Sequence, residues 1–268
     1  MTEGNVSYRK APPIAYVTID RPEVMNAIDP PTSAAMKRVW DDFVADDSLL
    51  VAILTGAGDK AFCAGADLKY RLKHPGYSYG RGKDSFPQQF GGLVRAPLPK
   101  PVVAAVNGYC LGGGLELVLA CDIAVASESA TFALPEVRNA GTIPGSGGTL
   151  RIARQVPLKI AMWMLLSGER MSAEEALRVG LVNRVVPPRD LMDEATRMAG
   201  IIAQNRPEAV RLAKAIALRS LDRPLVDPPS AWDLYDLIPD SDSERSAEIE
   251  ARKAFFARSS RSGDGSET

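Results

Sequence analysis

Two glutamates decide what chemistry this sequence can support. Glu116 comes shortly after three consecutive glycines, 112–114, and Glu136 follows it by 20 residues. That separation suits a helix, a strand and a return turn, so both carboxyl groups could enter one cavity. Paired carboxyl groups in a confined site can share a proton and act as general acid and general base. The alternative is a helix-dipole partner at Glu116 and an ordinary surface acid at Glu136.

The glycines at 112–114 point to an anion-binding helix start. They follow an apolar run at 102–106 and precede the apolar stretch 115–120, which we predict to be a short helix with Glu116 in its first turn. Glycine costs backbone entropy but lets another group approach bare N–H groups. The first N–H groups of a helix have no partner within it, and the helix dipole favours negative charge there. Close packing of the turn is the alternative, which accounts for one glycine more easily than for three.

Two other segments combine small residues with potential reactive groups. In 60–68, small residues again permit close approach to the backbone, whereas Cys63 lacks a histidine placed to activate it as a nucleophile. The glycine cluster 141–149 lacks the lysine and hydroxyl pair of a phosphate-binding loop. We therefore interpret this cluster as a turn that shapes the wall behind Glu136.

An aromatic segment at 70–92 fits neither the strand nor the helix pattern. Its tyrosines and phenylalanines are spaced among glycine, proline, lysine and arginine. Long loops in compact domains are often functional, which slightly favours a lid or pocket wall over a plain surface loop. His74, the only histidine of the chain, lies in this segment, and we expect it at the surface.

The elements around these residues indicate an α/β protein. Short apolar runs predict buried strands at 14–20, 51–55, 102–106, 123–126 and 181–186. Helical spacing predicts helices at 29–43, 191–205, 207–221 and 245–256. Buried strands that alternate with helices predict layered sheets in a core that holds the active site, residues 1–200. A helical region follows at 201–268, and we expect its last residues, 259–268, to be disordered.

Composition and charge restrict the classes of partner. Hydrophobic residues make up 46% of the 268 residues and charged residues 24%, as in globular proteins. The net charge is -1 and no Lys/Arg run exceeds a pair, so we expect neither nucleic acid nor a membrane as partner. A single histidine argues against a metal site. The polar N-terminus, the three cysteines without a C-x-x-C pair and the lack of an apolar run of about 18 residues predict a cytoplasmic protein.

In their order along the chain, five segments resemble the crotonase superfamily, also called the enoyl-CoA hydratase/isomerase family. They are 22–28, 61–68, 101–122, 132–145 and 172–183, and the resemblance extends from Val17 to Phe256. It implies a repeated β-β-α superhelix with a helical C-terminal trimerisation region, assembled as a homotrimer or as a hexamer of two trimers. It also implies an acyl-CoA substrate and no cofactor, because the CoA group belongs to the substrate.

The resemblance assigns roles to individual residues. The backbone N–H groups that bind the thioester oxygen in the family correspond to Ala66 and Gly113, and such donors typically contribute ~3–4 kcal/mol each. Glu116 corresponds to the residue that orients and deprotonates water, and Glu136 to the residue that gives a proton to C2. The substrate-binding positions implied by these segments are Ala64, Asp67, Leu68, Gly112 and Gly145.

The presence of both glutamates favours hydration of a 2-enoyl-CoA to a 3-hydroxyacyl-CoA, as in fatty-acid metabolism. The stretches 133–136 and 171–177 are also similar to the carnitinyl-CoA dehydratase branch, which applies the same chemistry to a charged acyl group. The resemblance is also compatible with double-bond isomerisation, with thioester hydrolysis and with a catalytically inactive acyl-CoA-binding protein. Leu150 departs from the glutamine that is usual in the fatty-acid enzymes. The basic residue that contacts the CoA phosphate has no clear match near Arg252 and Lys253.

Overall fold

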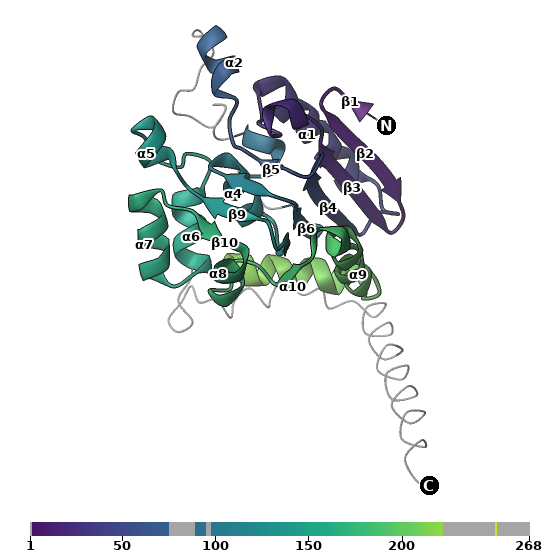
Figure 1. Ribbon diagram of the computed structural model, residues 1–268. Helices are drawn as coiled ribbons and strands as arrows, with labels where there is room; N and C mark the ends of the chain where they lie inside the picture. The colour runs from purple at the N-terminus through teal and green to yellow at the C-terminus, as the bar shows by residue number, and fades with distance from the viewer. Residues whose placement is uncertain (1, 75–88, 95–97, 222–249, 251–268) are drawn as a thin grey trace. The chain divides into compact units, whose positions relative to one another are not determined.

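The computed structural model describes residues 2–74, 89–94, 98–221 and 250 (Figure 1). The chain forms two compact units, Met1–Arg211 and Leu212–Thr268. The predicted division at residue 200 falls inside helix α9 (Leu191–Ala203), which belongs to the first unit because its buried side chains pack against the large sheet. The predicted helix at 245–256, apart from residue 250, and the predicted disordered tail lie outside the described residues.

A seven-stranded sheet forms the centre of the first unit, with the strand order β1-β2-β3-β4-β6-β8-β11. The strands from β3 onward run parallel, whereas β1 and β2 add antiparallel strands at one edge. Their bounds are β1 Thr2–Glu3, β2 Val6–Ala11, β3 Ile14–Ile19, β4 Val51–Gly56, β6 Val102–Val106, β8 Ile123–Ser127 and β11 Arg184–Val186. The predicted strands at 14–20, 51–55, 102–106 and 123–126 are confirmed.

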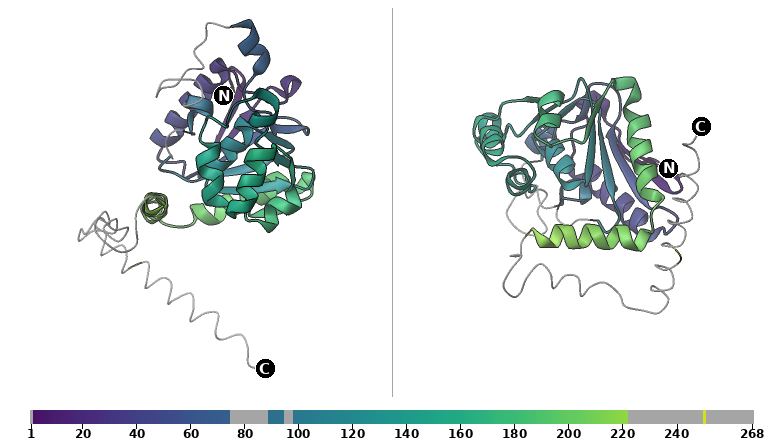
Figure 2. Two further views of the ribbon diagram at one scale, coloured as in Figure 1. Left: turned by 90° about the vertical axis from the view of Figure 1, so that its left-hand side faces the viewer. Right: turned by 90° about the horizontal axis from the view of Figure 1, so that it is seen from below.

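Helices cover both faces of this sheet, as expected for buried parallel strands. On one face lies α1 (Pro30–Ala45), which begins at the N-cap Asp29 and buries Met36, Trp40 and Phe43. On the other face α9 packs Leu191, Ala195 and Ala199 against β4, β6 and β8. The right-hand view of Figure 2, from below, shows the green α9 ribbon beside the sheet. The predicted helices in these two regions are confirmed.

The predicted strand at 181–186 is shorter than expected. Only Arg184–Val186 joins the sheet. The N–H groups of Leu181 and Val182 both donate to the carbonyl oxygen of Ala176 and so close the end of helix α8 (Ala173–Arg178). The side chains of Leu181 and Val182 are buried in the core while their N–H groups close a helix, which the hydrophobic pattern alone does not distinguish from a strand.

The sequence predicted layered sheets, but none of the strands of the second, four-stranded sheet was predicted. Its strands are β10 Met171–Ser172, β9 Thr131–Ala133, β7 Tyr109–Leu111 and β5 Ala61–Cys63, in this spatial order. Each strand has only two or three residues, too few to show a period in the sequence. Three of them, β5, β7 and β9, run parallel to one another. Their carboxyl ends therefore meet at one edge of the sheet.

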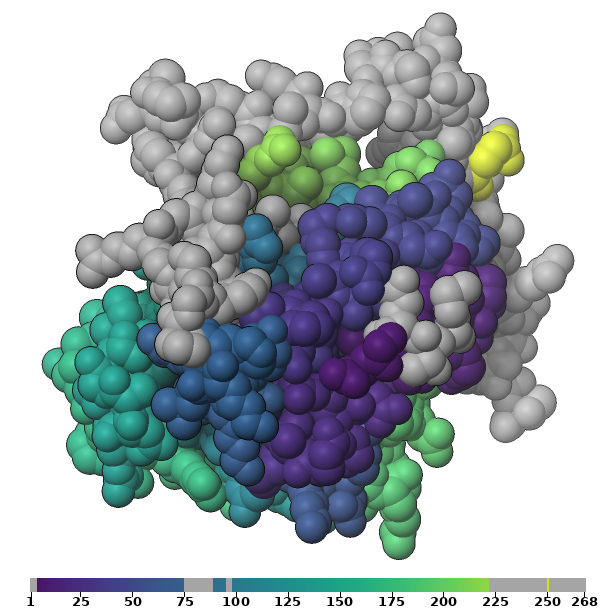
Figure 3. Space-filling model, turned by 90° about the horizontal axis from the view of Figure 1, so that it is seen from above, coloured from purple at the N-terminus to yellow at the C-terminus, as the bar shows by residue number. Residues whose placement is uncertain are grey.

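The remaining helices complete the described chain. They are η1 Pro22–Val24, α2 Leu68–Lys73, η2 Phe90–Gly92, α4 Gly113–Ala120, α5 Glu136–Ala140, α6 Gly148–Gln155, α7 Leu158–Ser167, η3 Pro188–Asp190 and α10 Pro207–Ser220. In Figure 3, the blue segment that ends in α2 is exposed on the face seen from above. The helices α4 and α10 confirm the predictions at 115–120 and 207–221.

Candidate active site

Three loops of the candidate site leave the same edge of the four-stranded sheet. Ala66 follows β5, Gly113 follows β7 and Glu136 follows β9. Because these strands are parallel neighbours, the loops after them lie side by side. Ligands of α/β sheets commonly bind at the carboxyl ends of strands for this reason. The fold thus brings together three segments that are far apart in the sequence.

The N–H group of Ala66 is turned away from its neighbouring segment. Ala66 forms a parallel bridge with Ile28, in which the Ile28 N–H donates to Gly65 O at 2.8 Å and the Asp67 N–H donates to Ile28 O at 2.9 Å. The bridge uses the groups on either side of Ala66, so its own N–H points elsewhere. Within the described part of the chain this N–H makes no backbone hydrogen bond. It is available to an external acceptor.

Gly113 begins helix α4 directly beside this loop. Its N–H is the first of the helix, where no acceptor exists within the helix. A methyl group built on Gly65 would lie only 3.1 Å from the Gly113 nitrogen, so the loop after β5 passes close to the helix start. The two N–H groups predicted to bind the thioester oxygen, those of Ala66 and Gly113, therefore lie on adjacent segments. Their role as an oxyanion hole stays a prediction.

Close packing explains more of the glycine run than we expected from the sequence. A methyl group on Gly113 would lie 2.5 Å from the Phe90 ring, and one on Gly114 would lie 2.1 Å from the Cys63 carbonyl oxygen. Gly112 has φ 56° and ψ -122°, a conformation open mainly to glycine, and a methyl group there would lie 3.0 Å from Glu136 Oε1. The glycines thus seat α4 on β5 and bring Glu136 to the helix start.

The close packing at Gly114 leads to a stability prediction. Gly114→Ala should lower the free energy of unfolding by about 1–3 kcal/mol, the usual cost of overpacking, because the new methyl group would meet a backbone oxygen. Gly200→Ala in α9 is the matched control, since a methyl group there meets nothing within 4 Å. Alanine should stabilise that helix by up to about 1 kcal/mol. Urea unfolding measures both, and a Gly114→Ala variant as stable as the unmodified protein would contradict the packing described.

Glu116 presents a buried carboxyl group from the start of α4. Its side chain is 3% exposed, and Oε1 accepts hydrogen bonds from the N–H groups of Ser146 at 2.7 Å and Gly148 at 2.8 Å. Burial raises the pKa of Glu116, while these two donors and the positive charge of Arg151 oppose the rise. The carboxyl group of Glu116 is therefore buried, and its Oε1 atom has two fixed hydrogen-bond donors.

The glycine cluster 141–149 differs from its predicted role. It does contain a turn, with α6 beginning at Gly148, but the turn's N–H groups bind Glu116, whereas we expected it behind Glu136. A methyl group on Gly148 would lie 2.9 Å from Glu116 Cγ, so glycine permits the close approach. Spacing along the chain does not show which of two nearby carboxyl groups a turn faces.

Glu136, the first residue of α5, has a different environment. Its Oε2 atom is buried and has no hydrogen-bond partner among the residues that the structure describes. Burial raises the pKa of Glu136 to about 7, and the negative charge of Glu116 adds to the rise. A carboxyl group in such a setting retains a proton near neutral pH. The two carboxyl groups thus differ in their hydrogen bonding, because two backbone N–H groups bind Glu116 Oε1, whereas Oε2 of Glu136 has no partner among the described residues.

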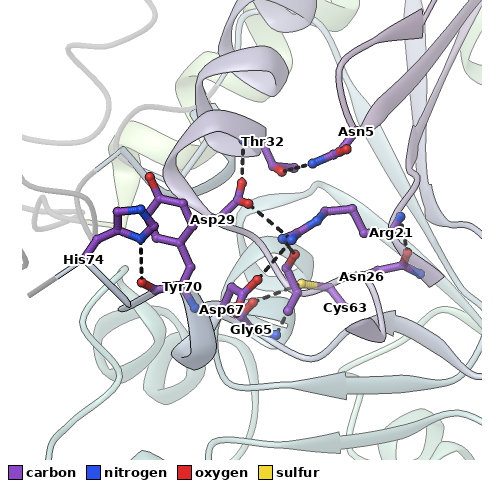
Figure 4. Close-up of polar contacts among 11 residues, drawn as sticks. Asn5, Arg21, Asn26, Asp29, Thr32, Cys63, Gly65, Asp67, Tyr70 and His74 are labelled. Atoms are coloured by element: carbon purple, nitrogen blue, oxygen red, sulfur yellow. Dashed lines mark hydrogen bonds and ion pairs between the residues drawn. The ribbon is translucent and has the colours of Figure 1, made fainter. Parts of the chain in front are cut away.

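A buried ion-pair cluster fixes the loop that carries Ala66 (Figure 4). The Arg21 Nη2 atom lies 3.0 Å from Asp67 Oδ2 and 3.2 Å from Asp29 Oδ2. Each carboxylate also accepts a backbone N–H at a helix start, Asp29 for α1 and Asp67 for α2. The Asp67 side chain is therefore committed to holding the loop. Its assignment to substrate binding stays a prediction.

The remaining predicted substrate-binding residues lie on the same loops. The Ala64 N–H donates to the carbonyl oxygen of Met25, Leu68 begins α2 with 58% of its surface exposed, and Gly145 lies in the turn before α6. Their contacts with substrate, like those of Gly112, stay predictions. Cys63 is fully buried, and burial raises the pKa of its thiol to about 12, which makes it a poor nucleophile.

Residues 89–94 support the helix start from another direction. The Phe90 ring packs against Gly113, and Phe90 is 2% exposed. The segment is anchored to α1, because Trp40 Nε1 donates to Gly91 O at 2.8 Å. This part of the aromatic segment 70–92 is therefore buried beside the candidate site, and residues 75–88 lie outside the described residues. His74 is exposed as predicted, stacked on Tyr70.

Arg151 was not predicted as a site residue. This arginine lies in the first turn of α6, where the helix dipole disfavours a cation. A cation in such a position indicates a compensating partner, and the structure supplies one in Glu116. The neighbouring Leu150, which departs from the glutamine usual in the fatty-acid enzymes, is 66% exposed.

Metal-binding clusters and membrane-spanning helices are absent from the described ranges. No group of three or more His, Cys, Asp or Glu side chains there is arranged to hold a metal ion. None of the helices in the same ranges has the length and apolar character needed to cross a membrane.

Residues 9–238 match the family model described as enoyl-CoA hydratase/isomerase. The chain belongs to this family. Relatives include (E)-benzylidenesuccinyl-CoA hydratase of Thauera aromatica, 43% identical over 79% of this chain and 81% of the relative. A carnitinyl-CoA dehydratase of Salmonella arizonae is 46% identical over 78% of each chain.

Solved structures of the family share the fold. The enoyl-CoA hydratase of Bacillus anthracis aligns with a TM-score of 0.82 at 33% identity and covers 95% of this chain and 97% of its own. A carnitinyl-CoA dehydratase from Mycobacterium avium 104 aligns with a TM-score of 0.73 at 39% identity and covers 85% of this chain and 86% of its own. The crotonase-like α/β fold predicted from the sequence is confirmed, and the protein is an enzyme of this family.

Proposed function

We propose that this enzyme adds water to the double bond of a 2-enoyl-CoA and forms a 3-hydroxyacyl-CoA. The contrast between the two carboxyl groups supports the proposal most strongly. One oxygen of Glu116 accepts two backbone N–H groups, whereas Oε2 of Glu136 has no partner among the described residues. This difference in hydrogen bonding supports Glu116 as the general base and Glu136 as the general acid, two roles that require opposite protonation states.

The reaction follows from this arrangement. The Glu116 carboxylate takes a proton from water as the water oxygen bonds to C3. The π electrons of the C2–C3 bond move toward the thioester oxygen, where the N–H groups of Ala66 and Gly113 stabilise the negative charge. Glu136 then gives its proton to C2. A proton passes from Glu116 to Glu136 before the next turnover, so the enzyme returns to its starting state.

The same geometry supports the reverse reaction on a different acyl group. The relatives named (E)-benzylidenesuccinyl-CoA hydratase and carnitinyl-CoA dehydratase favour hydration or dehydration of an acyl chain with an additional charged group as the second candidate. The two candidates can be separated with a panel of substrates: crotonyl-CoA and longer 2-enoyl-CoAs test the simple acyl chain, and enoyl-CoAs bearing a carboxylate or quaternary ammonium group test the charged one. We expect loss of the enoyl-thioester absorbance and a product heavier by one water. Tight binding of the panel without turnover would instead support an inactive acyl-CoA-binding protein.

We also propose that the reaction needs no cofactor and occurs in the cytoplasm, within fatty-acid metabolism. Addition of water changes no net oxidation state, so the carboxyl pair and the N–H groups suffice. Free cysteines, including the buried Cys63 and Cys110, suit a reducing compartment. Activity that survives exhaustive dialysis against a chelator would support a reaction without a cofactor. Loss of activity with recovery on metal addition would contradict it.

A homotrimer or a hexamer of two trimers is proposed as the assembled state. Several large apolar side chains of α6 and α7 are exposed in the single chain: Leu150 66%, Leu158 60%, Trp163 64% and Leu166 67%. Exposed apolar surface of this kind commonly marks an interface. Trp163→Glu should therefore shift the sedimentation coefficient from that of a trimer or hexamer toward a monomer, while Glu128→Lys at an exposed turn should not. A monomeric unmodified enzyme would contradict the assembly.

A further inference from the structure

Arg151 joins two parts of the candidate site that no secondary-structure element connects. Its Nη1 atom donates to the carbonyl oxygen of Ser146 at 3.3 Å, and its Nη2 atom donates to the carbonyl oxygen of Val94. The guanidinium folds back over the turn so closely that a methyl group on Gly147 would lie 2.1 Å from Nη1. Gly147 has φ 99°, a conformation that favours glycine.

Each of these two contacts holds a different part of the site. Ser146 belongs to the turn whose N–H groups bind Glu116. Val94 belongs to the segment 89–94, whose Phe90 ring packs against Gly113 at the helix start. The planar fork of arginine can bond two acceptors in fixed directions, which a lysine cannot do.

We propose that Arg151 is a positioning residue, which sets the turn that binds Glu116 relative to the segment that supports Gly113. This inference rests on the proposed function, because it assigns Glu116 to water activation and Gly113 to the thioester oxygen. A displacement of about 1 Å between such groups can cost on the order of 10²-fold in rate.

The charge of Arg151 also acts on Glu116. Its positive field lowers the pKa of Glu116 against the rise caused by burial. The charged group facing Glu116 from α5 is Glu136, and Cys121 faces Arg151 from the end of α4. The thiol of Cys63 in β5 adds no charge, because burial raises its pKa to about 12. Loss of Arg151 therefore removes the positive charge that acts on Glu116, and the pKa of Glu116 should rise further.

The test compares Arg151→Met with Arg154→Met, an exposed arginine on the same helix. We expect Arg151→Met to lower kcat by about 10-fold to 10²-fold with a smaller change in KM, because positioning affects the transition state more than substrate binding. The acid limb of its pH profile should move to higher pH. Arg151→Lys should recover part of the pH profile but little of kcat, and Arg154→Met should match the unmodified enzyme. Unchanged kcat and pH profile in Arg151→Met would overturn the proposal.

Two further measurements separate this proposal from folding defects and from the proposed function. Added guanidinium should restore part of kcat in Arg151→Ala, which a misfolded variant would not show. Infrared titration of the Glu116 carboxyl band, assigned by its absence in Glu116→Gln, needs no turnover. A higher Glu116 pKa in Arg151→Met supports the role of Arg151 even if no acyl-CoA is converted. In that case only the hydratase proposal fails. An unchanged Glu116 pKa overturns the role of Arg151, whatever the activity.

Discussion

Glu116→Gln is expected to lower kcat/KM for hydration by about 10²-fold to 10⁴-fold, the usual contribution of a general base. Glutamine keeps the size of the side chain and an oxygen that can accept the N–H groups of Ser146 and Gly148. It cannot take a proton from water. The loss should therefore appear in kcat, measured by the decrease in enoyl-thioester absorbance, while substrate binding changes little.

Glu128→Gln is the matched control for this substitution. Glu128 is an exposed glutamate just after β8, outside the candidate site. It should retain the kcat/KM of the unmodified enzyme. If Glu116→Gln also retained full activity while remaining folded, water activation by Glu116 would be ruled out.

Glu136→Gln is expected to have a comparable effect through the other half of the reaction. The amide cannot deliver a proton to C2, so kcat should fall by about 10²-fold or more. The unmodified enzyme should also show an alkaline limb. Because the pKa of Glu136 is raised to about 7, the protonated form needed for hydration is present below that pH and is lost as the pH rises through it. The pH dependence of kcat/KM measures the limb.

The residual activity of Glu136→Gln should lack this alkaline limb. A limb at the same pH in the variant would mean that another group supplies the proton. The dehydration direction gives a second check, since it requires the same singly protonated pair. Exchange of the C2 hydrogen of a 3-hydroxyacyl-CoA with solvent deuterium should be lost in the variant and retained in Glu128→Gln.

Apolar runs made the inner strands of the large sheet predictable from the sequence, whereas the edge strands β1 and β2 were not predicted. The strands β3, β4, β6 and β8 are buried on both faces, so their sequences are continuous apolar runs between turn residues. The four-stranded sheet has strands of two or three residues, in which no period can develop. The edge that assembles the site was therefore not predictable from local patterns, although the loops themselves were recognised by their glycines.

The site residues were predictable to different degrees. Glu116 and Glu136 are conspicuous because each lies in an apolar, glycine-rich setting. The turn in 141–149 was recognised but was expected behind Glu136, whereas its N–H groups bind Glu116. Which carboxyl group the turn contacts depends on how α6 packs on α4. Arg151 was missed, because its contacts are with backbone oxygens far away in the sequence, such as that of Val94. Only the tertiary structure shows contacts of this kind.

Isotope labelling distinguishes water addition by Glu116 from thioester hydrolysis and from a reaction that does not need this residue. The enzyme is incubated with a 2-enoyl-CoA in water enriched in oxygen-18 and deuterium, and the products are analysed by mass spectrometry. We predict a 3-hydroxyacyl-CoA with oxygen-18 on C3 and one deuterium on C2, formed at the same rate by the unmodified enzyme and by Glu128→Gln, and about 10²-fold or more slowly by Glu116→Gln. Oxygen-18 in a free carboxylic acid would show thioester hydrolysis instead, and a labelled 3-hydroxyacyl-CoA formed equally well without Glu116 would contradict the mechanism.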